Sequence, residues 1–316
     1  MSKVKSYLSL IKFSHTIFAM PFALIGFFLG LRATGELVYK VVDVGQWNLN
    51  KTVGWEKNNV PISQLTSQPI NKFLLIILCM IFARSAAMAF NRYLDRNFDA
   101  MNPRTAIREI PAGILKANSV LLFTIINCLL FIACTFFINR LCFYLSPIAL
   151  LVVLGYSYTK RFTPLCHLVL GLGLSLAPIG AYLAVTGVFH WLPVLFSLAV
   201  IFWVSGFDII YALQDEEFDK EHKLYSMPAW LGKAKALRVS ELFHVLSSAC
   251  VIAAGWFGGF GWLYWLGVAV FAGMLIYQHS LVKPNDLRKV NLAFMTANGI
   301  ASVVFAIFVI ADLFIN

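Results

Sequence analysis

Long apolar runs separated by short polar loops dominate this chain of 316 residues. A run of about 20 apolar residues is long enough to cross the hydrocarbon core of a bilayer as a helix. The pattern predicts nine membrane-spanning helices, at residues 14–33, 71–91, 118–138, 141–158, 165–186, 191–212, 237–257, 262–281 and 292–314. We therefore expect an all-α, polytopic membrane protein that forms a single domain over residues 1–316.

The composition supports this fold class. Hydrophobic residues make up 60% of the chain and charged residues only 13%, whereas a soluble domain averages about 25% charged residues. The net charge is +10, but the basic residues lie in short loops and not on one soluble face, so we expect no nucleic acid partner. The six cysteines form no C-x-x-C pair. We therefore read no zinc or redox motif and expect the thiols to act as small buried apolar groups.

Lysine and arginine predict the orientation, because the cytoplasmic loops of membrane proteins carry an excess of these residues. With the N-terminus in the cytoplasm, 18 of them face the cytoplasm and six face the other side, with Arg84 inside a span. We expect a multi-pass protein of the cell inner (cytoplasmic) membrane, with its C-terminus outside. The apolar run after residues 1–15 is long and has no small-residue cleavage site, so we expect a retained helix and no signal peptide.

The densest polar segment follows the second predicted span, at residues 91–113 (NRYLDRNFDAMNPRTAIREIPAG). Three of its side chains are four residues apart and drift by only about 40° per step on a helix, which makes one stripe: Asn91, Asp95 and Asp99. A proline then breaks the helix, and Arg104 and Arg108 follow, again four apart. Such a set suits a divalent cation held by carboxylates, with phosphate oxygens shared between the cation and the arginines.

A second acidic segment, residues 208–222, ends the sixth predicted span. Asp208 lies seven residues before Asp215, and Asp219 lies four after it, spacings that keep one helical face. Mg²⁺ prefers one or two carboxylates together with substrate phosphates, so two such segments facing each other would suit one diphosphate bridged by two metal ions. Three glutamates leave this face, and we expect them to be solvated loop charges: Glu216, Glu217 and Glu221.

Three further polar residues lie near these segments. Tyr156 and Lys160 end the fourth span four residues apart and point the same way. The ammonium group could neutralise leaving-group charge, or both side chains could simply snorkel to the interface. Arg84 lies inside the second span, on the face of Asn91, where a charge costs at least about 2.5 kcal/mol and normally faces a wet cavity or a partner. We expect Arg84 to line the active-site cavity and hold substrate oxygens, or to form a structural pair with an acid such as Asp208.

The histidines near span ends do not show the spacing of metal ligands. We expect them to be structural or interfacial: His167, His190, His244 and His279.

Three motifs resemble those of the UbiA superfamily of intramembrane prenyltransferases: residues 91–113, the pair Tyr156-x-x-x-Lys160, and IIYALQDEEFDKEHKLYSMPAWLG at 209–232. Within the superfamily the chain looks most like the 4-hydroxybenzoate polyprenyltransferases and their relatives in menaquinone biosynthesis. The resemblance implies nine transmembrane helices around a central cavity open to lipid and capped by the two acidic segments. It implies metal sets of Asn91, Asp95, Asp99 and of Asp215, Asp219, and diphosphate contacts from Arg104, Arg108 and Lys160, to which we add Asn91 and Arg84.

The resemblance also implies an activity. We expect an enzyme that uses Mg²⁺, with two ions, to transfer a polyprenyl group from polyprenyl diphosphate to an aromatic acid, 4-hydroxybenzoate or similar, in ubiquinone or menaquinone biosynthesis. The expected catalytic residues are Tyr156, Lys160, Asp208 and Asp215, with one of the two aspartates taking up the phenol proton. Closure of residues 101–113 and 216–230 would exclude water.

Other functions stay open at this point. The acceptor could be another one used in the superfamily: dihydroxynaphthoate, homogentisate, haem or a glyceryl phosphate. An ion or organic-acid transporter could use Arg84 and Asp208 as a relay, but it would leave the paired acidic segments unexplained. A non-catalytic lipid-binding scaffold would tolerate the loss of any single aspartate.

One segment departs from the family pattern. Residues 35–69 are longer than the connection we expect between the first two helices. We expect an extracytoplasmic loop insertion at about 35–70, on the face opposite the metal site. The sequence pattern favours no particular oligomeric state.

Overall fold

The protein is described by a computed structural model that covers residues 3–11, 18–35 and 62–316. Helices make up nearly all of it: α1 (Lys3–Leu10), α2 (Met20–Ala33), α3 (Ile62–Leu94), α4 (Arg96–Met101), α5 (Ala117–Ile138), α6 (Arg140–Thr159), α7 (Cys166–Thr186), α8 (Trp191–Ala212), η2 (Leu213–Asp215), α9 (Glu216–Glu221), α10 (Met227–Leu231), α11 (Lys233–Gly258), α12 (Trp262–Leu281), the π-helical η3 (Leu292–Ala297) and α13 (Asn298–Ile315). No strand forms within these described ranges, so the predicted all-α class is confirmed.

The helices match the predicted spans closely. Seven helices of the described chain are long and apolar enough to cross a membrane, and α2 is a shorter apolar helix. The helix α12 occupies the predicted range 262–281 but is not among those seven, so the count of nine spans stays a prediction. Residues 14–17 of the first predicted span lie outside the described residues.

The predicted insertion at 35–70 falls mostly on residues 36–61, outside the described part of the chain. The described end of this range, from Ile62 to Pro69, is already helical and belongs to α3. A proline near the start of a long helix breaks one backbone hydrogen bond without ending the helix when the residues on both sides stay helical.

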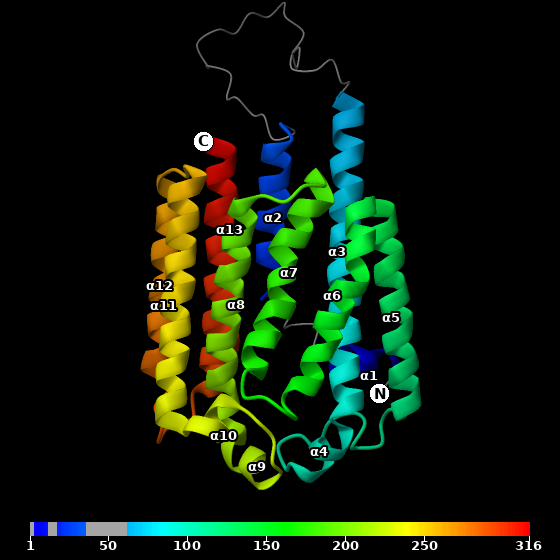
Figure 1. Cartoon of the computed structure of the whole chain (residues 1–316), viewed down its shortest axis with the longest axis vertical. Coiled ribbons are helices and arrows are strands. Elements are labelled where there is room, and N and C mark those ends of the chain that lie inside the picture. The colour runs from blue at the N-terminus through cyan, green and yellow to red at the C-terminus, as the bar shows by residue number, and fades with distance from the viewer. Residues whose placement is uncertain (1–2, 12–17, 36–61) are drawn as a thin grey trace, which may run out of the picture.

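The long helices pack side by side, with α3 against α5 and with α7 and α11 both against α8 (Figure 1). The short helices α4, α9 and α10 lie together at one end of the bundle, together with α1 (Figure 1). The C-terminus lies at the opposite end. The fold therefore brings both acidic segments to the end that carries α1, and the side of the membrane on which this end lies stays a prediction.

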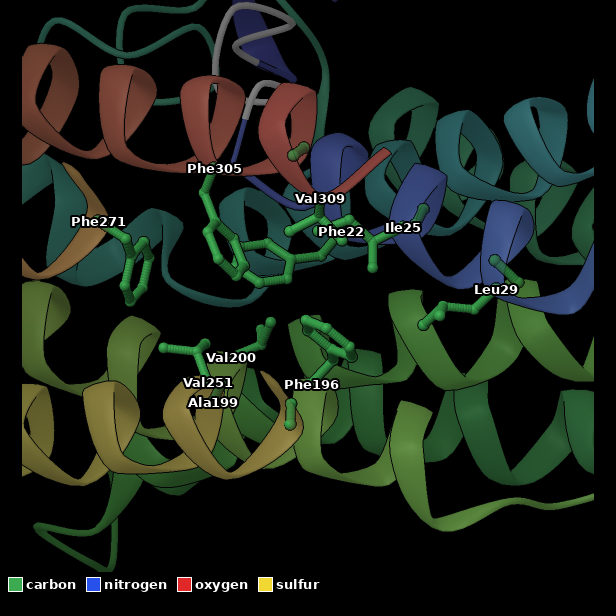
Figure 2. Close-up of a cluster of buried hydrophobic side chains, with 14 of the residues drawn as sticks. Phe22, Ile25, Leu29, Phe196, Ala199, Val200, Val251, Phe271, Phe305 and Val309 are labelled. Atoms are coloured by element: carbon green, nitrogen blue, oxygen red, sulfur yellow. The ribbon is translucent and has the colours of Figure 1, made fainter. Parts of the chain in front are cut away.

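The largest apolar core joins α2, α7, α8, α11, α12 and α13. At its centre, fully buried aromatic rings contact one another across helices: Phe22, Phe196, Trp203, Phe271 and Phe305. Figure 2 shows four of them, Phe22, Phe196, Phe271 and Phe305. The Trp203 indole N–H donates to Asn298 Oδ1 at 2.9 Å, so the buried indole nitrogen has a hydrogen-bond partner. This half of the bundle is thus solidly packed, and the cavities described below lie beside it.

Close helix packing at α2 and α7 depends on a glycine. A Cβ atom at Gly26 would lie 2.0 Å from the carbonyl oxygen of Pro178, a backbone atom that cannot move aside as a side chain can. Small residues let helix backbones approach in this way inside membranes.

We expect Gly26→Ala to destabilise the protein by about 1–3 kcal/mol, because the added methyl group overpacks the contact between α2 and α7. Thermal unfolding of the detergent-solubilised protein measures the effect. The matched control is Gly180→Ala, since a Cβ there meets nothing within 4 Å. Equal unfolding temperatures for the two variants would contradict the packing argument.

Candidate active site

The first acidic segment keeps its predicted stripe although one helix ends within it. The helix α3 ends at Leu94 and α4 begins at Arg96. The backbone bonds still follow the helical pattern, from Asp95 N–H to Asn91 O at 2.9 Å and from Asp99 N–H to Asp95 O at 2.8 Å. The predicted break follows α4, where Asn102 adopts an extended conformation before the proline. The chain then turns back, which carries the arginines toward the second acidic segment.

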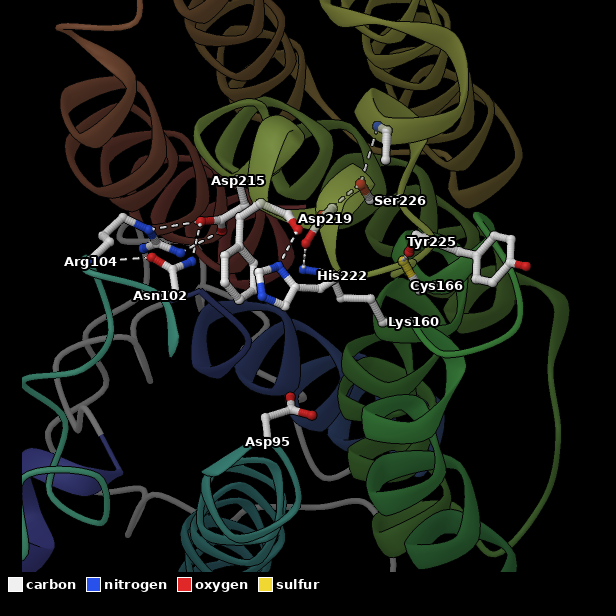
Figure 3. Close-up of polar contacts among 12 residues, drawn as sticks. Asp95, Asn102, Arg104, Lys160, Cys166, Asp215, Asp219, His222, Tyr225 and Ser226 are labelled. Carbon is white, nitrogen blue, oxygen red and sulfur yellow. Dashed lines mark hydrogen bonds and ion pairs between the residues drawn. The ribbon is translucent and has the colours of Figure 1, made fainter. Parts of the chain in front are cut away.

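The four aspartates expected to bind metal are each held by one cationic side chain. Arg104 donates to Asp215 from Nε at 3.0 Å and from Nη2 at 2.5 Å, and Lys160 Nζ lies 2.7 Å from Asp219 Oδ1 (Figure 3). The other two pairs are Arg108–Asp99 at 2.5 Å and Arg161–Asp95 at 3.0 Å. The pair Arg104–Asp215 links the two acidic segments directly, and Asn102 adds a bond of 3.3 Å to Asp215.

One polar cavity of about 300 Å³ lies between the segments. Ten of the eleven residues proposed from the sequence line it: Arg84, Asn91, Asp95, Asp99, Arg104, Arg108, Tyr156, Lys160, Asp208 and Asp215. The eleventh, Asp219, is fully buried behind Lys160. The two acidic segments therefore share one cavity, as their spacing suggested.

A second cavity, of about 420 Å³ and with a mostly apolar lining, lies between α3, α5, α6 and α7. The two cavities share five lining residues: Arg84, Met88, Tyr156, Leu170 and Leu174. A ligand with a charged head and an apolar tail could therefore reach from one cavity into the other past Tyr156 and Arg84.

Two buried guanidinium groups face the polar cavity without a carboxylate. Arg84 and Arg92 both line it, and the Nε atom of each is buried without a hydrogen-bond partner. Among the described residues neither forms an ion pair. The structural alternative for Arg84, a pair with Asp208, is thus not formed, because Asp208 Oδ2 instead lies 2.7 Å from His167 Nδ1. Burying an unpaired cation is costly, so these two groups are suited to an anionic ligand.

The carboxylates suit a hard cation. In the described part of the chain no three His, Cys, Asp or Glu side chains are grouped closely enough to hold a metal ion. Mg²⁺ needs only one or two carboxylates when substrate phosphates complete its coordination. Asp99 Oδ2 is buried without a hydrogen-bond partner, which leaves an oxygen of the expected kind free. The residues present therefore fit Mg²⁺ bound together with a diphosphate.

Burial sets the charge state of two groups at the cavity. It raises the pKa of Asp95 to about 6 from an ordinary 3.8, although Arg161 opposes the shift. Burial lowers the pKa of Lys160, but the ion pair and hydrogen bond with Asp219, together with the charge of Asp215, outweigh it and leave that pKa above its ordinary value. Lys160 is thus a permanent cation at neutral pH, whereas ionising Asp95 costs free energy until a cation relieves it.

The sequence pattern missed several lining residues. Arg92, Arg161 and His167 line the polar cavity, but the first two read as ordinary loop charges and we expected His167 to be structural. The expectation for Glu216 is wrong: it is only 8% exposed, and it accepts from Lys220 at 2.6 Å and lies 3.7 Å from Lys233. Its place at the start of α9, packed under the lysines of α9 and α11, depends on tertiary structure that spacing does not show.

Comparison with known proteins decides the family. The model of the UbiA prenyltransferase family matches residues 62–300. The chain belongs to this family. It is 31% identical over 239 residues to a 4-hydroxybenzoate octaprenyltransferase of Tolumonas auensis, covering 75% of this chain and 83% of the relative. It is 30% identical over 233 residues to an enzyme of the same name from Aeromonas salmonicida, covering 73% and 80%.

Solved structures share the fold. The apo structure of a UbiA homologue from Aeropyrum pernix superposes with a TM-score of 0.72 at 26% identity, covering 94% of this chain and 96% of the other. A UbiA homologue from Archaeoglobus fulgidus, bound to DMAPP and Mg²⁺, gives 0.65 at 19% identity, covering 98% and 100%. The predicted resemblance to the superfamily is therefore confirmed, and with it an integral membrane enzyme of the aromatic, 4-hydroxybenzoate polyprenyltransferase-like type.

We expect Asp95→Asn to stabilise the metal-free protein increasingly as pH rises. A carboxyl group whose pKa is higher in the folded than in the unfolded state destabilises the folded protein once it ionises. The stability of the fold therefore falls as pH rises from the unfolded pKa to the folded pKa, here from 3.8 to about 6. The full difference corresponds to about 3 kcal/mol. We therefore measure unfolding temperatures in the presence of chelator at about pH 4.5 and about pH 7.5. The difference in unfolding temperature between the variant and the natural chain should be larger at the higher pH. A constant separation would show that burial of Asp95 is not the cause.

Proposed function

We propose that the protein transfers a polyprenyl group from polyprenyl diphosphate to an aromatic acid, 4-hydroxybenzoate or similar, with Mg²⁺ as cofactor. The observation that carries the proposal is the joining of two cavities, one lined by carboxylates and cations and one apolar, past Arg84 and Tyr156. The names of the relatives that share about 30% identity support the same reaction, and so does the DMAPP and Mg²⁺ bound to a structural neighbour.

The diphosphate head would occupy the polar cavity. Arg104, Arg108 and Lys160 now hold Asp215, Asp99 and Asp219. When substrate binds, we infer that these cations turn to phosphate oxygens, where arginine offers a fork of donors, and that the released carboxylates become metal ligands, with Asn91 and Asp95 beside them. The exchange keeps every charge paired, which a site of low dielectric requires.

Bound Mg²⁺, with two ions proposed, would supply charge stabilisation for the departing diphosphate. Lys160 contributes to the same end as a permanent cation at the end of the fourth span. Tyr156 lies at the junction of the two cavities, beside the place where the allylic carbon of a substrate spanning them would lie. The apolar cavity takes the tail.

The geometry favours Asp208 over Asp215 as the base. Asp215 is engaged by Arg104, Asn102 and the proposed metal. Asp208 lines the cavity with a side chain 24% exposed, and among the described residues its one hydrogen-bond partner is His167. In the reaction the bond between the allylic carbon and the diphosphate oxygen breaks, and that carbon bonds to a ring carbon of the acceptor. The ring then releases one proton, which the Asp208 carboxylate would accept.

Arg84 is the candidate for holding the acceptor's carboxylate. Its unpaired guanidinium faces the cavity about two helical turns below Asn91. A carboxylate offers two oxygens to a guanidinium fork. Dihydroxynaphthoate and homogentisate also carry a carboxylate, so Arg84 fits these acceptors equally well and the assay must compare them. We propose that the site faces the cytoplasm and that the prenyl substrate enters it from the bilayer.

We expect membranes containing the protein to attach labelled prenyl from a polyprenyl diphosphate to at least one aromatic acid, only when Mg²⁺ is present. Asp95→Ala and Asp215→Ala should each abolish product formation, because each removes a proposed metal ligand. Glu217→Ala is the matched control, since this exposed carboxylate of the second segment lies outside the cavity lining.

Product formation in excess chelator, or full activity of either aspartate variant, would refute the metal assignment. Formation of no product with any of the acids would refute the proposed reaction.

We expect Arg84→Met to raise the KM for the acceptor by about tenfold to a hundredfold, because a charge-assisted hydrogen bond is worth about 1.5–3 kcal/mol. The KM for the prenyl diphosphate should change little. Arg84→Lys keeps the charge and should recover part of the loss. A rise in the diphosphate KM instead would place Arg84 at the diphosphate, as the sequence pattern also allowed.

A further inference from the structure

A short clasp, residues Tyr225–Met227, joins the end of the second acidic segment to the turn between α6 and α7. Tyr225 N–H donates to the Lys160 carbonyl at 2.7 Å, and the Cys166 thiol donates to the Tyr225 carbonyl at 3.5 Å. Ser226, which is fully buried, donates from Oγ to Asp219 Oδ2 at 2.8 Å. Tyr225 and Ser226 therefore connect the clasp to the backbone of Lys160, the thiol of Cys166 and the carboxylate of Asp219.

The third residue of the clasp bonds to a histidine of α7. Met227 N–H donates to His167 Nε2 at 3.2 Å. A ring nitrogen that accepts a hydrogen bond carries no proton, so the proton of His167 must be on Nδ1. His167 Nδ1 therefore donates to Asp208 Oδ2 at 2.7 Å. The docked clasp thus fixes the tautomer that gives Asp208 a hydrogen-bond donor.

The surroundings hold this arrangement in place. His167 is 3% exposed and Met227 is 5% exposed, so water cannot replace either partner freely. The chain reaches the clasp through Lys223, which adopts φ = 55°. A side chain other than glycine in this left-handed region costs about 1–2 kcal/mol, which the bonds of the clasp must offset. The turn would therefore relax if the clasp released.

We propose that His167 is a positioning residue, which holds the Asp208 carboxylate toward the substrate and does so only while the clasp Tyr225–Met227 is docked. The inference rests on the proposed function, in which Asp208 accepts the acceptor's proton. Beyond that function, docking of the second acidic segment would determine whether the Asp208 carboxylate is oriented to accept a proton. An open segment would leave Nε2 without its donor and the ring free to change tautomer or rotate.

The variant pair His167→Leu and His167→Gln tests the role of the ring. Leucine has a side chain of similar size but makes neither hydrogen bond, whereas the glutamine amide keeps one donor and one acceptor. We expect His167→Leu to lower kcat by up to about a hundredfold, the scale of a misplaced reacting group, with the KM of the prenyl diphosphate nearly unchanged. His167→Gln should recover most of kcat. Wild-type kcat in the leucine variant, or no recovery with glutamine, would overturn the proposal.

A second pair tests the clasp itself. Met227 is the first residue of α10, a position where proline is tolerated because its missing N–H has no helical partner. Ser226 before it is extended, with ψ = 161°, as the residue before a proline must be. Met227→Pro therefore deletes the N–H that reaches His167, and Met227→Ala loses the side chain but keeps that N–H. We expect the proline variant to match His167→Leu in kcat and the double variant to be no worse. Equal activity of the two Met227 variants would overturn the coupling.

Amide hydrogen exchange of the full-length protein over residues 224–231 gives a readout that needs no turnover. His167→Leu should speed exchange of this segment, and His167→Gln should not. Unchanged exchange in the leucine variant would overturn the clasp contact whatever the activity. If the natural chain gives no product with any acceptor, the proposed function fails, and the exchange result alone decides whether His167 holds the clasp.

Discussion

The structure depends on pairing of buried charges where two acidic segments meet at the end of an apolar bundle. Four carboxylates at this place each contact one cationic side chain, and the pair Arg104–Asp215 joins the two segments. Buried pairs of this kind add little net stability, since removing both charges from water costs about as much as their attraction returns. In the proposed function their value is chemical, because the carboxylates would bind the metal and the cations would bind the phosphate once substrate replaces the present pairs.

The rest of the fold sets where these charges can act. The aromatic core of α2, α8, α12 and α13 is densely packed (Figure 2), so the apolar cavity proposed for the prenyl tail lies on the other side, between α3, α5, α6 and α7. The cavity there meets the polar one at Arg84 and Tyr156. A ligand with a charged head and an apolar tail would therefore fit with its head in the polar cavity and its tail in the apolar one. The clasp at Tyr225–Met227 connects the second segment, through His167, to Asp208, the proposed base.

Much of this could be predicted from the sequence. The range 191–212 predicted for the sixth span is that of α8, and the range 262–281 is that of α12, because apolar runs bounded by loops reflect bilayer thickness directly. The four-residue spacings of the acidic segments indicated the side chains that share one cavity, with the exception of Asp219, which is buried behind Lys160. The partners of the charged side chains could not be predicted, because the pairs Arg161–Asp95 and His167–Asp208 each connect residues far apart in the chain. A single histidine in an apolar run carries no periodic signal, and neither does the burial of Glu216.

The exchange of charge partners is tested most directly by a structure of the protein with Mg²⁺ and a non-reactive polyprenyl diphosphate analogue. We expect Arg104 and Lys160 to leave Asp215 and Asp219 and to contact phosphate oxygens, while the aspartates coordinate the metal. Retention of the present carboxylate partners by Arg104 and Lys160, with the analogue and metal bound, would contradict the exchange of charge partners.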